Sequence, residues 1–433
     1  MCKTKIYILI LLSSLSFYNP MGLISQTTSK LLFYIIFLYA LFVAIKRKSY
    51  HNTTIYPKYP YLLILSGFIT ATFNAQLIHE QNILTSFIAI LPYFFSYLSF
   101  YILFKFDIPK DKIRKIIFTF CFISMAIYIV NYLTLPNKLF GGEIEEIDTS
   151  RGLARIGVFS IELIVFMLFY SIAQWNSSKK KKYLYLIGLS IIFIFLSLTR
   201  QIIFLSLLFG LILYINKQSI YKKVIIAIMS LFIYLFILPQ IPIYNNLVEL
   251  SENQVEENKY GEENIRITAW KFYTYEYQEN YLTAIFGNGV PSMGNSKWGN
   301  EFQKTIYFEY GGNGCFTSDV GWAGFYWNYG LFATIGLISL LLKAIFYKKR
   351  YNEEYLTYWC VFIFLTSFAS GPIIIGKQII SIMTVLYLIF GRRRNTIGIK
   401  KTFSDYPFMH LLYSQLLVCQ RVCLQNTVCL ICK

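Results

Sequence analysis

The chain has 433 residues and a net charge of +18; 56% of its residues are hydrophobic and 19% are aromatic. Only 14% are charged, against about 25% in soluble domains, so the composition excludes an ordinary soluble enzyme. The Lys and Arg residues separate long apolar runs and do not cover one face. Membrane topology and anionic lipid headgroups explain this pattern better than a nucleic-acid partner. We therefore expect contact with membrane lipids and no nucleic acid.

Apolar runs of transmembrane length recur from the N-terminus to about residue 390. The first run follows Lys3 and Lys5, but no small-residue cleavage site comes after it, so we expect an uncleaved span. The runs predict an all-α fold, a polytopic transmembrane helical bundle of about 12 spans. The predicted spans are residues 6–24, 31–45, 61–79, 83–104, 116–134, 156–174, 183–198, 201–215, 224–242, 321–342, 356–372 and 375–390.

Basic clusters between the runs mark the cytoplasmic side. They predict a multi-pass protein of the bacterial inner membrane with both termini in the cytoplasm. The stretch 183–215 lies between two such clusters and is interrupted only at Thr199–Gln201. One helix of that length would measure about 50 Å, against a hydrocarbon core of about 30 Å. Two short helices with Arg200 at their outer turn satisfy both constraints. Two basic clusters also flank residues 356–390, so this stretch too must cross the membrane an even number of times. Its outer turn would carry Lys377.

Residues 243–320 break this charge pattern. They hold 11 of the 22 acidic side chains but only 5 of the 40 Lys and Arg. A long acidic loop is free to cross the membrane. We therefore expect a large periplasmic loop containing short helices, inserted in a transmembrane domain of residues 1–400.

The last part of the chain, residues 401–433, predicts a disordered, Cys-rich cytoplasmic tail. Its four cysteines fall within the last 15 residues. A zinc site there is the weaker interpretation, because the tail lacks a second well-spaced cysteine pair. The sequence also contains no phosphate-binding loop, no dinucleotide fingerprint and no HExxH or EF-hand pattern. We therefore expect no metal and no cofactor.

The residues most open to a chemical role are cations on the predicted outer side. An Arg at an outer turn opposes the positive-inside bias, and its guanidinium fork suits phosphate oxygens. For Arg200 the alternative is a side chain that extends to the lipid headgroups. These outer cations are Arg151, Arg155, Arg200, Arg266 and Lys377.

Aromatic residues follow Arg266 at helical spacing. Trp270, Tyr273, Tyr277 and Tyr281 share one face of a helix that begins at Arg266. Such a face can stack on sugar rings, or it can belong to an amphipathic helix in the membrane interface.

Asp319 is the only acidic residue where the chain re-enters the membrane. It is a candidate general base, and equally a candidate helix N-cap.

The order of these motifs resembles the O-antigen polymerase and O-antigen ligase superfamily of membrane glycosyltransferases. An Arg-x-x-x-Trp motif opens the outer loop, a Phe-Gly-x-Gly turn follows, and Asn-Tyr-Gly-Leu-Phe stands after re-entry. The resemblance covers residues 150–345. The matching residues are Arg155, Arg200, Arg266, Trp270, Gly287, Gly289 and Gly330. The loop His of the family has no counterpart here, and Ser318 or Asp319 occupies its neighbourhood. This difference favours the polymerase.

The resemblance implies a metal-independent glycosyltransferase. It would polymerise undecaprenyl-pyrophosphate-linked oligosaccharide repeat units into O-antigen or capsular or exopolysaccharide on the outer face of the inner membrane. A chain-length regulator and a flippase of the same pathway are the implied partners. On this basis we expect Arg266, Arg200 and Asp319 to be catalytic, and Arg155, Arg151, Trp270, Tyr273 and Lys377 to bind substrate.

Two alternatives stay open. One is the ligase of the same superfamily, which differs in its acceptor. The other is a transporter or flippase of lipid-linked oligosaccharide, which carries out no chemistry. A transporter predicts ionisable residues inside the spans, and Glu162 is the main residue of that kind.

Overall fold

The computed structural model describes residues 3–15, 24–46, 57–135, 139–140, 158–223, 265–278, 280–309, 315–347 and 353–391, with 225, 228, 236 and 238–240. Every regular element in these residues is a helix, which confirms the predicted all-α class for this part of the chain. The chain divides into two units, Met1–Gly391 and Arg392–Lys433. The second unit contains the predicted tail and lies outside the described residues.

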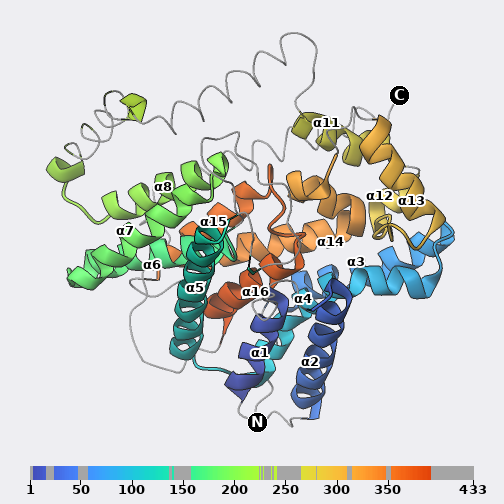
Figure 1. Cartoon of the computed structure of the whole chain (residues 1–433), viewed down its shortest axis with the longest axis horizontal. Helices are drawn as coiled ribbons and strands as arrows, with labels where there is room; N and C mark the ends of the chain where they lie inside the picture. Colours follow the sequence, from blue (N-terminus) through green and yellow to red (C-terminus); the bar gives the residue numbers. More distant parts are fainter. Residues whose placement is uncertain are drawn as a thin grey trace. The chain divides into compact units, whose positions relative to one another are not determined.

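Figure 1 follows the first unit along the chain. The first half contains α1 (Lys3–Leu15), α2 (Gln26–Lys46), α3 (Lys58–Leu77), α4 (Ile83–Phe106), α5 (Lys110–Leu133), α6 (Ile161–Ser178), α7 (Lys181–Leu196) and α8 (Arg200–Ile215). Short helices follow, namely η2 (Leu238–Gln240), α11 (Ile265–Lys271), η3 (Phe272–Glu276), α12 (Tyr281–Phe286), α13 (Lys297–Lys304), η4 (Thr305–Glu309) and η5 (Thr317–Asp319). The last three are α14 (Gly321–Phe346), α15 (Tyr355–Thr366) and α16 (Gly376–Phe390).

Four helices, α2, α4, α5 and α14, are long and apolar enough to cross a membrane. Helices α8, α15 and α16 are apolar but shorter. The outward side of α2 carries exposed apolar residues such as Leu31, Ile35, Leu38 and Phe42, as expected of a helix that faces lipid. Helices α1 to α8 and α14 to α16 overlap predicted spans, whereas the predicted span 224–242 lies mostly outside the described residues.

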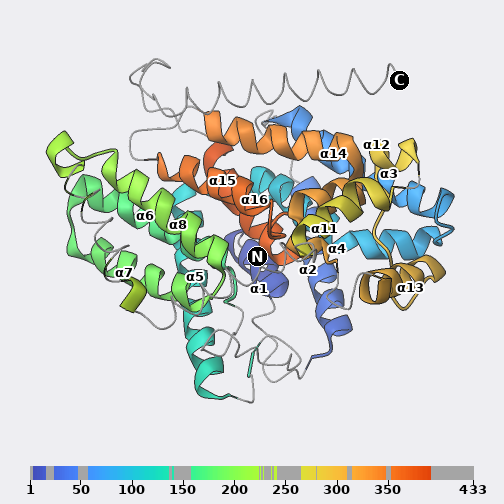
Figure 2. The ribbon, with the colours of Figure 1, turned by 90° about the horizontal axis from the view of Figure 1, so that it is seen from above.

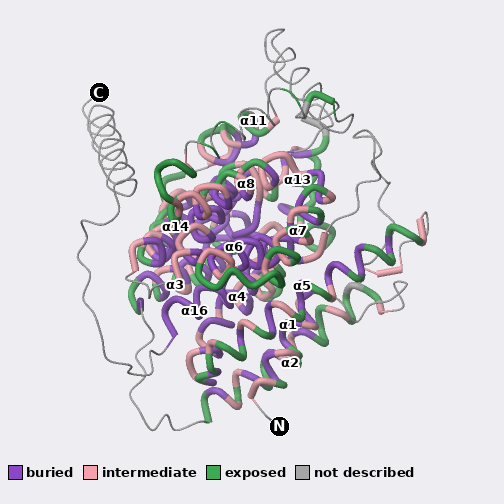
Figure 3. The backbone as a smooth tube through the Cα atoms, turned by 90° about the vertical axis from the view of Figure 1, so that its left-hand side faces the viewer, coloured by how far each residue is buried: buried purple, intermediate pink, exposed green. Residues whose placement is uncertain are grey.

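Close packing around α14 brings the elements together. Helix α14 packs along α3 and also contacts α12, α15 and η3. Small residues permit the approach to α3: a Cβ built on Gly67 would lie 2.4 Å from the Cβ of Ala333. In Figure 2, α15 and α16 lie between α6–α8 on one side and α3–α4 on the other. Figure 3 shows the buried residues along α6 and α16.

The stretch 183–215 forms two helices, as predicted from its length. Helix α7 ends at Leu196 and α8 begins at Arg200. No Gly or Pro makes the turn. Instead, Leu198 takes a left-handed conformation with φ of 50°, which is rare for a bulky residue. Its side chain is only 2% exposed, so tertiary packing holds this backbone in place.

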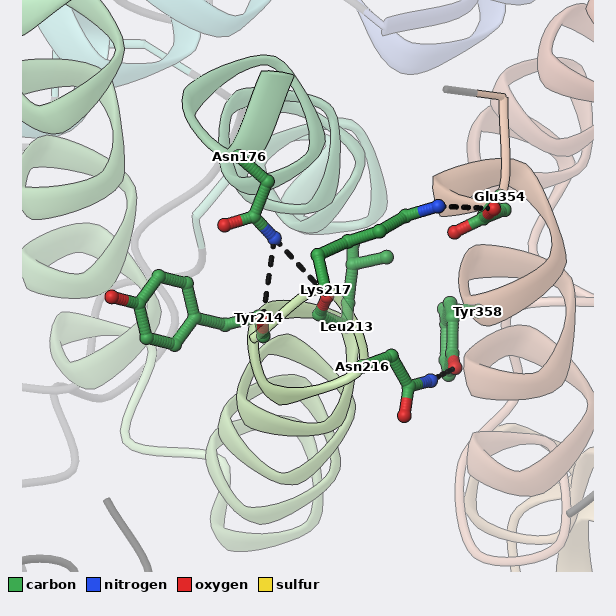
Figure 4. Close-up of polar contacts among 7 residues, drawn as sticks. All are labelled: Asn176, Leu213, Tyr214, Asn216, Lys217, Glu354 and Tyr358. Atoms are coloured by element: carbon green, nitrogen blue, oxygen red, sulfur yellow. Dashed lines mark hydrogen bonds and ion pairs between the residues drawn. The ribbon is translucent and has the colours of Figure 1, made fainter. Parts of the chain in front are cut away.

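Polar contacts hold α8 against its neighbours at both ends. Near its C-terminal end, the Asn176 side chain donates to the backbone oxygens of Leu213 and Tyr214 at 3.3 and 3.4 Å (Figure 4). Lys217 also pairs with Glu354 at 2.7 Å there.

At the other end, Gln201 Nε2 donates to the backbone oxygens of Leu365 and Thr366, each at 3.2 Å. The start of α8, where Arg200 stands, is therefore fixed against the end of α15.

Candidate functional site

The charge of one predicted catalytic residue, Arg266, acts on another, Arg200, although the two are far apart in the sequence. Arg200 is the first residue of α8, and Arg266 lies in the first turn of α11. Partial burial and, second, the positive charge of Arg266 lower the pKa of Arg200 below its ordinary value. Two guanidinium groups that act on each other raise the local positive potential, which suits a polyanion such as a pyrophosphate.

Trp270 anchors α11 to the connection between α15 and α16, residues 367–375. Its Nε1 donates to the backbone oxygen of Phe368 at 2.9 Å. The two rings also stack, with centroids 6.0 Å apart. The Phe368 ring is exposed and Trp270 is half-buried. Trp270 stands one helical turn after Arg266 on α11, so one ring of this aromatic pair belongs to the same short helix as Arg266.

The start of α14 is bound to the same connection. The Gly321 and Trp322 amides donate to the backbone oxygens of Ser370 and Ser367 at 3.1 and 2.9 Å. A Cβ built on Gly371 would lie 2.8 Å from the Cα of Ser318, so only a glycine permits this approach. The connection thus positions η5, which carries Asp319.

Asp319 lies on η5, and η5 contacts α11. The N-cap position of α14 is Val320, so the alternative that Asp319 caps this helix is wrong. Its negative charge acts on Cys315 and Tyr273. Burial, then the charges of Glu276 and Asp319, raise the pKa of the Cys315 thiol to about 11.

Tyr273 is fully buried, and its hydroxyl donates to the Cys315 backbone oxygen at 2.6 Å. Burial also raises the pKa of Tyr273 well above its usual value. Tyr273 belongs to an apolar core that also contains Phe272, Trp298, Phe302 and Trp327. A predicted role of Tyr273 in substrate binding would require this core to open.

The predicted continuous aromatic face from Arg266 to Tyr281 does not form. Helix α11 ends at Lys271 and a π-helical turn follows, in which the Tyr277 amide donates to the Phe272 oxygen at 2.9 Å. A new helix starts after Asn280, whose side chain accepts from the Thr283 amide in a capping box. Tyr281 is consequently 89% exposed on a different helix.

The glycines of the Phe-Gly-x-Gly turn and of α14 meet. Helix α14 is kinked at Gly330, which has φ of 79°. The Gly289 amide donates to the Asn328 oxygen at 3.0 Å, and a Cβ built on Gly330 would lie 2.4 Å from the nitrogen of Gly287. The turn therefore fits into the kink and accounts for the glycines at both places.

Sequence reasoning did not assign a place to His79. It follows α3 and stacks on Trp298 with ring centroids 3.9 Å apart. It also shares a 3.0 Å hydrogen bond with the Asn288 side chain. No local sequence signal predicts this contact, because the partners are more than 200 residues away.

Lys377 is the second residue of α16, the helix that follows the same connection. Its side chain is exposed, and its Nζ lies 5.7 Å from the centre of the Phe159 ring. Arg151 and Arg155 lie outside the described residues. The structure thus joins Trp270 of α11 and Ser318 of η5, which also carries Asp319, to the 367–375 connection, and it fixes the start of α8 at the neighbouring end of α15. Within the described residues, no group of three His, Cys, Asp or Glu side chains is placed to hold a metal ion.

In comparisons with known proteins, no family model matches the chain and no curated protein matches it.

Proposed function

We propose that the chain is a metal-independent glycosyltransferase of the membrane. It polymerises oligosaccharide repeat units carried on undecaprenyl pyrophosphate into O-antigen or another surface polysaccharide. The observation that carries the proposal is the action of the Arg266 charge on Arg200, together with the exposed Phe368 ring that stacks on Trp270 of the same short helix as Arg266. This combination offers a place for a pyrophosphate and for a sugar face.

The transfer reaction requires that the pyrophosphate leaving group be stabilised. The acceptor hydroxyl attacks the anomeric carbon of the donor, and the bond to the pyrophosphate oxygen breaks with its electron pair. Preorganised guanidinium groups stabilise the charge that develops on that oxygen. Asp319 is the proposed proton acceptor, because a carboxylate near the acceptor can take the hydroxyl proton.

The proposal includes a topology of about 12 spans, with both termini in the cytoplasm of the bacterial cell and residues 243–320 outside. The four long apolar helices and the basic clusters support it. Reporter fusions at Lys180, Lys222 and Arg393 are expected to be cytoplasmic, and fusions at Asn253 and Gly294 periplasmic. A cytoplasmic reporter signal at Gly294 would place the site on the wrong side for this reaction.

The decisive experiment for the activity is Arg266→Ala in a strain that makes the polysaccharide. We expect polymer to disappear while single repeat units still reach the lipid acceptor, since transport and ligation continue. Loss of all surface sugar, including single units, would favour the transporter or the ligase. The matched control is Lys297→Ala, because Lys297 is also a cation of the outer segment but its side chain is 88% exposed and faces Glu301.

Asp319→Asn tests the proposed proton acceptor. The amide keeps the shape of the side chain but cannot accept the proton, so polymer formation should fall by about 100-fold or more. Polymer formation at the wild-type rate in a well-expressed Asp319→Asn protein would remove Asp319 from the mechanism.

A further inference from the structure

Glu162 has a buried carboxyl group that takes no part in the contacts described above. Its side chain is 3% exposed, and within the described residues its Oε2 atom has no hydrogen-bond partner. The same holds for the Oγ atom of Ser160, two residues earlier and 6% exposed. Ser160 also has a left-handed backbone, with φ of 53°. Strained residues and unpaired buried polar atoms are costly and collect at functional positions.

Among the described residues, the charge that acts on Glu162 is that of Lys377 on α16, whose Nζ lies 5.7 Å from the ring centre of Phe159, three residues before Glu162. From α15, the Trp359 indole donates to the Glu162 backbone oxygen at 2.8 Å. From α5, the Cys121 thiol donates to the backbone oxygen of Leu163 on α6 at 3.2 Å. On α8, Arg200 is the first residue. On α7, the lysines stand in the first turn of the helix, which follows the C-terminal end of α6. Lys377 is therefore the group to which the charge of Glu162 matters most.

We propose that Glu162 is a proton-binding site whose occupancy controls Lys377. Removal from water disfavours a charge on a carboxyl that has an unpaired oxygen, so the resting group is protonated and Lys377 keeps its full charge for an anionic ligand. Loss of the proton to water leaves a carboxylate, which draws Lys377 to itself. The bound species is a proton and not a sodium ion, because two unpaired oxygens beside a lysine are too few ligands for a metal cation.

The inference rests on the proposed function in one respect, namely that the anionic ligand of Lys377 is the pyrophosphate of the lipid-linked donor. As the pH rises, Glu162 loses its proton and Lys377 is withdrawn from the donor. The apparent KM for the donor should then rise by about tenfold, the value of one charged contact. Glu162→Gln should keep the low KM over the whole pH range.

The first experiment does not depend on activity. The infrared band of protonated carboxyl groups is followed against pH for the full chain in lipid nanodiscs. Glu162→Gln should remove one titrating component, whereas Glu301→Gln, an exposed carboxyl, should not. Lys377→Met should move the component to higher pH, because the carboxylate loses its neighbouring cation. An unchanged titration in both Glu162→Gln and Lys377→Met overturns the proton site.

Sodium and activity complete the test. Replacing sodium with choline at constant pH should leave the band unchanged, and a shift would mean a cation site and overturn the proposal. The KM of the wild-type protein and of Glu162→Gln is then measured against pH. A rise of KM in Glu162→Gln equal to that of the wild type overturns the control of Lys377. If no preparation forms polymer, the proposed function fails, while the infrared result still decides the proton site.

Discussion

The two ends of α8 use charge in opposite ways. Beyond its last turn, Lys217 meets the carboxylate of Glu354 at 2.7 Å, and the Asn216 amide donates to the Tyr358 hydroxyl. At its first residue, the positive charge of Arg266 acts on Arg200. Opposite charges and hydrogen bonds stabilise a contact, whereas neighbouring like charges destabilise it unless an anion stands between them. The pair at one end stabilises the packing of α8, whereas the like charges at the other end are those that the proposed function assigns to an anionic ligand.

The site has two kinds of component: a backbone framework and the charged side chains that it carries. Around the 367–375 connection, backbone hydrogen bonds and close glycine contacts fix the positions of the elements. The predicted site residues Arg200, Arg266 and Asp319 are carried on these elements. A substitution of a charged residue should then affect activity, and a substitution of a glycine should affect the fold.

Arg200→Ala gives the largest expected effect on activity. Removal of one of two guanidinium groups from a developing charge should lower polymer formation by about 100-fold or more. Thermostability in detergent should stay near the wild-type value, because the proposed role of Arg200 is to hold the pyrophosphate and not the fold. Arg200→Lys should also lose most activity if both oxygens of a phosphate are held at once, since Lys offers only a point charge.

Two other results would change the interpretation of Arg200. A protein that is both inactive and destabilised by a few kcal/mol would mean that Arg200 pairs with a protein carboxylate. Wild-type polymer together with wild-type stability would mean that the side chain only extends to lipid headgroups, and Arg200 would leave the site.

Gly330→Ala should have the next largest effect, and it should act on stability. The residue has φ of 79°, and the new Cβ would lie 2.4 Å from a backbone nitrogen. Strain of this kind costs about 1–3 kcal/mol before the clash is counted, so the melting temperature and the yield of folded protein should fall. Gly188→Ala on α7 is the control, since its Cβ meets nothing within 4 Å. Equal behaviour of the two variants would contradict the structural role of the kink.

Much of the fold follows from local sequence. The lengths of the apolar runs and the basic clusters predict where helices occur and that the stretch 183–215 breaks at Arg200. The break itself depends on Leu198 in a left-handed conformation. Only burial in the assembled protein stabilises that conformation, so turn propensity does not signal it. The aromatic spacing after Arg266 suggests one helix, but the π-helical turn after Lys271 overrides the period.

The candidate site was predictable as a set of residues and not as an arrangement. Arg200 and Arg266 stand out individually, because cations on the predicted outer side oppose the topological bias. Their interaction depends on how α8 packs on the end of α15 and how α11 packs on the connection that follows it, and these are tertiary contacts. The unpaired oxygen of Glu162 is likewise invisible in sequence, which places an acid in an apolar run without revealing its partners.

Tyr273→Phe should produce a moderate loss of stability with unchanged activity per folded molecule. The change removes the hydrogen bond from the Tyr273 hydroxyl to the Cys315 oxygen, which is worth about 1 kcal/mol. Cys315 is buried, and its raised pKa of about 11 keeps the thiol neutral at pH 7, so in the wild-type protein it should resist maleimide labelling until unfolding. Labelling should become faster in the variant. A large loss of activity at normal stability would instead return Tyr273 to the substrate site.

Breaking the opposite end of α8 should have the smallest effect. The Lys217–Glu354 pair is partly exposed, with side-chain exposures of 30% and 22%, and such pairs contribute about 1 kcal/mol or less. Lys217→Met and Glu354→Gln, alone and together, form a double-mutant cycle on thermostability with a small coupling energy. Polymer formation should remain near the wild-type level in all three proteins, because the remaining hydrogen bonds still hold α8 against α6 and α15. A loss of activity as large as that of Arg200→Ala, without loss of stability, would show that both ends of α8 belong to the site.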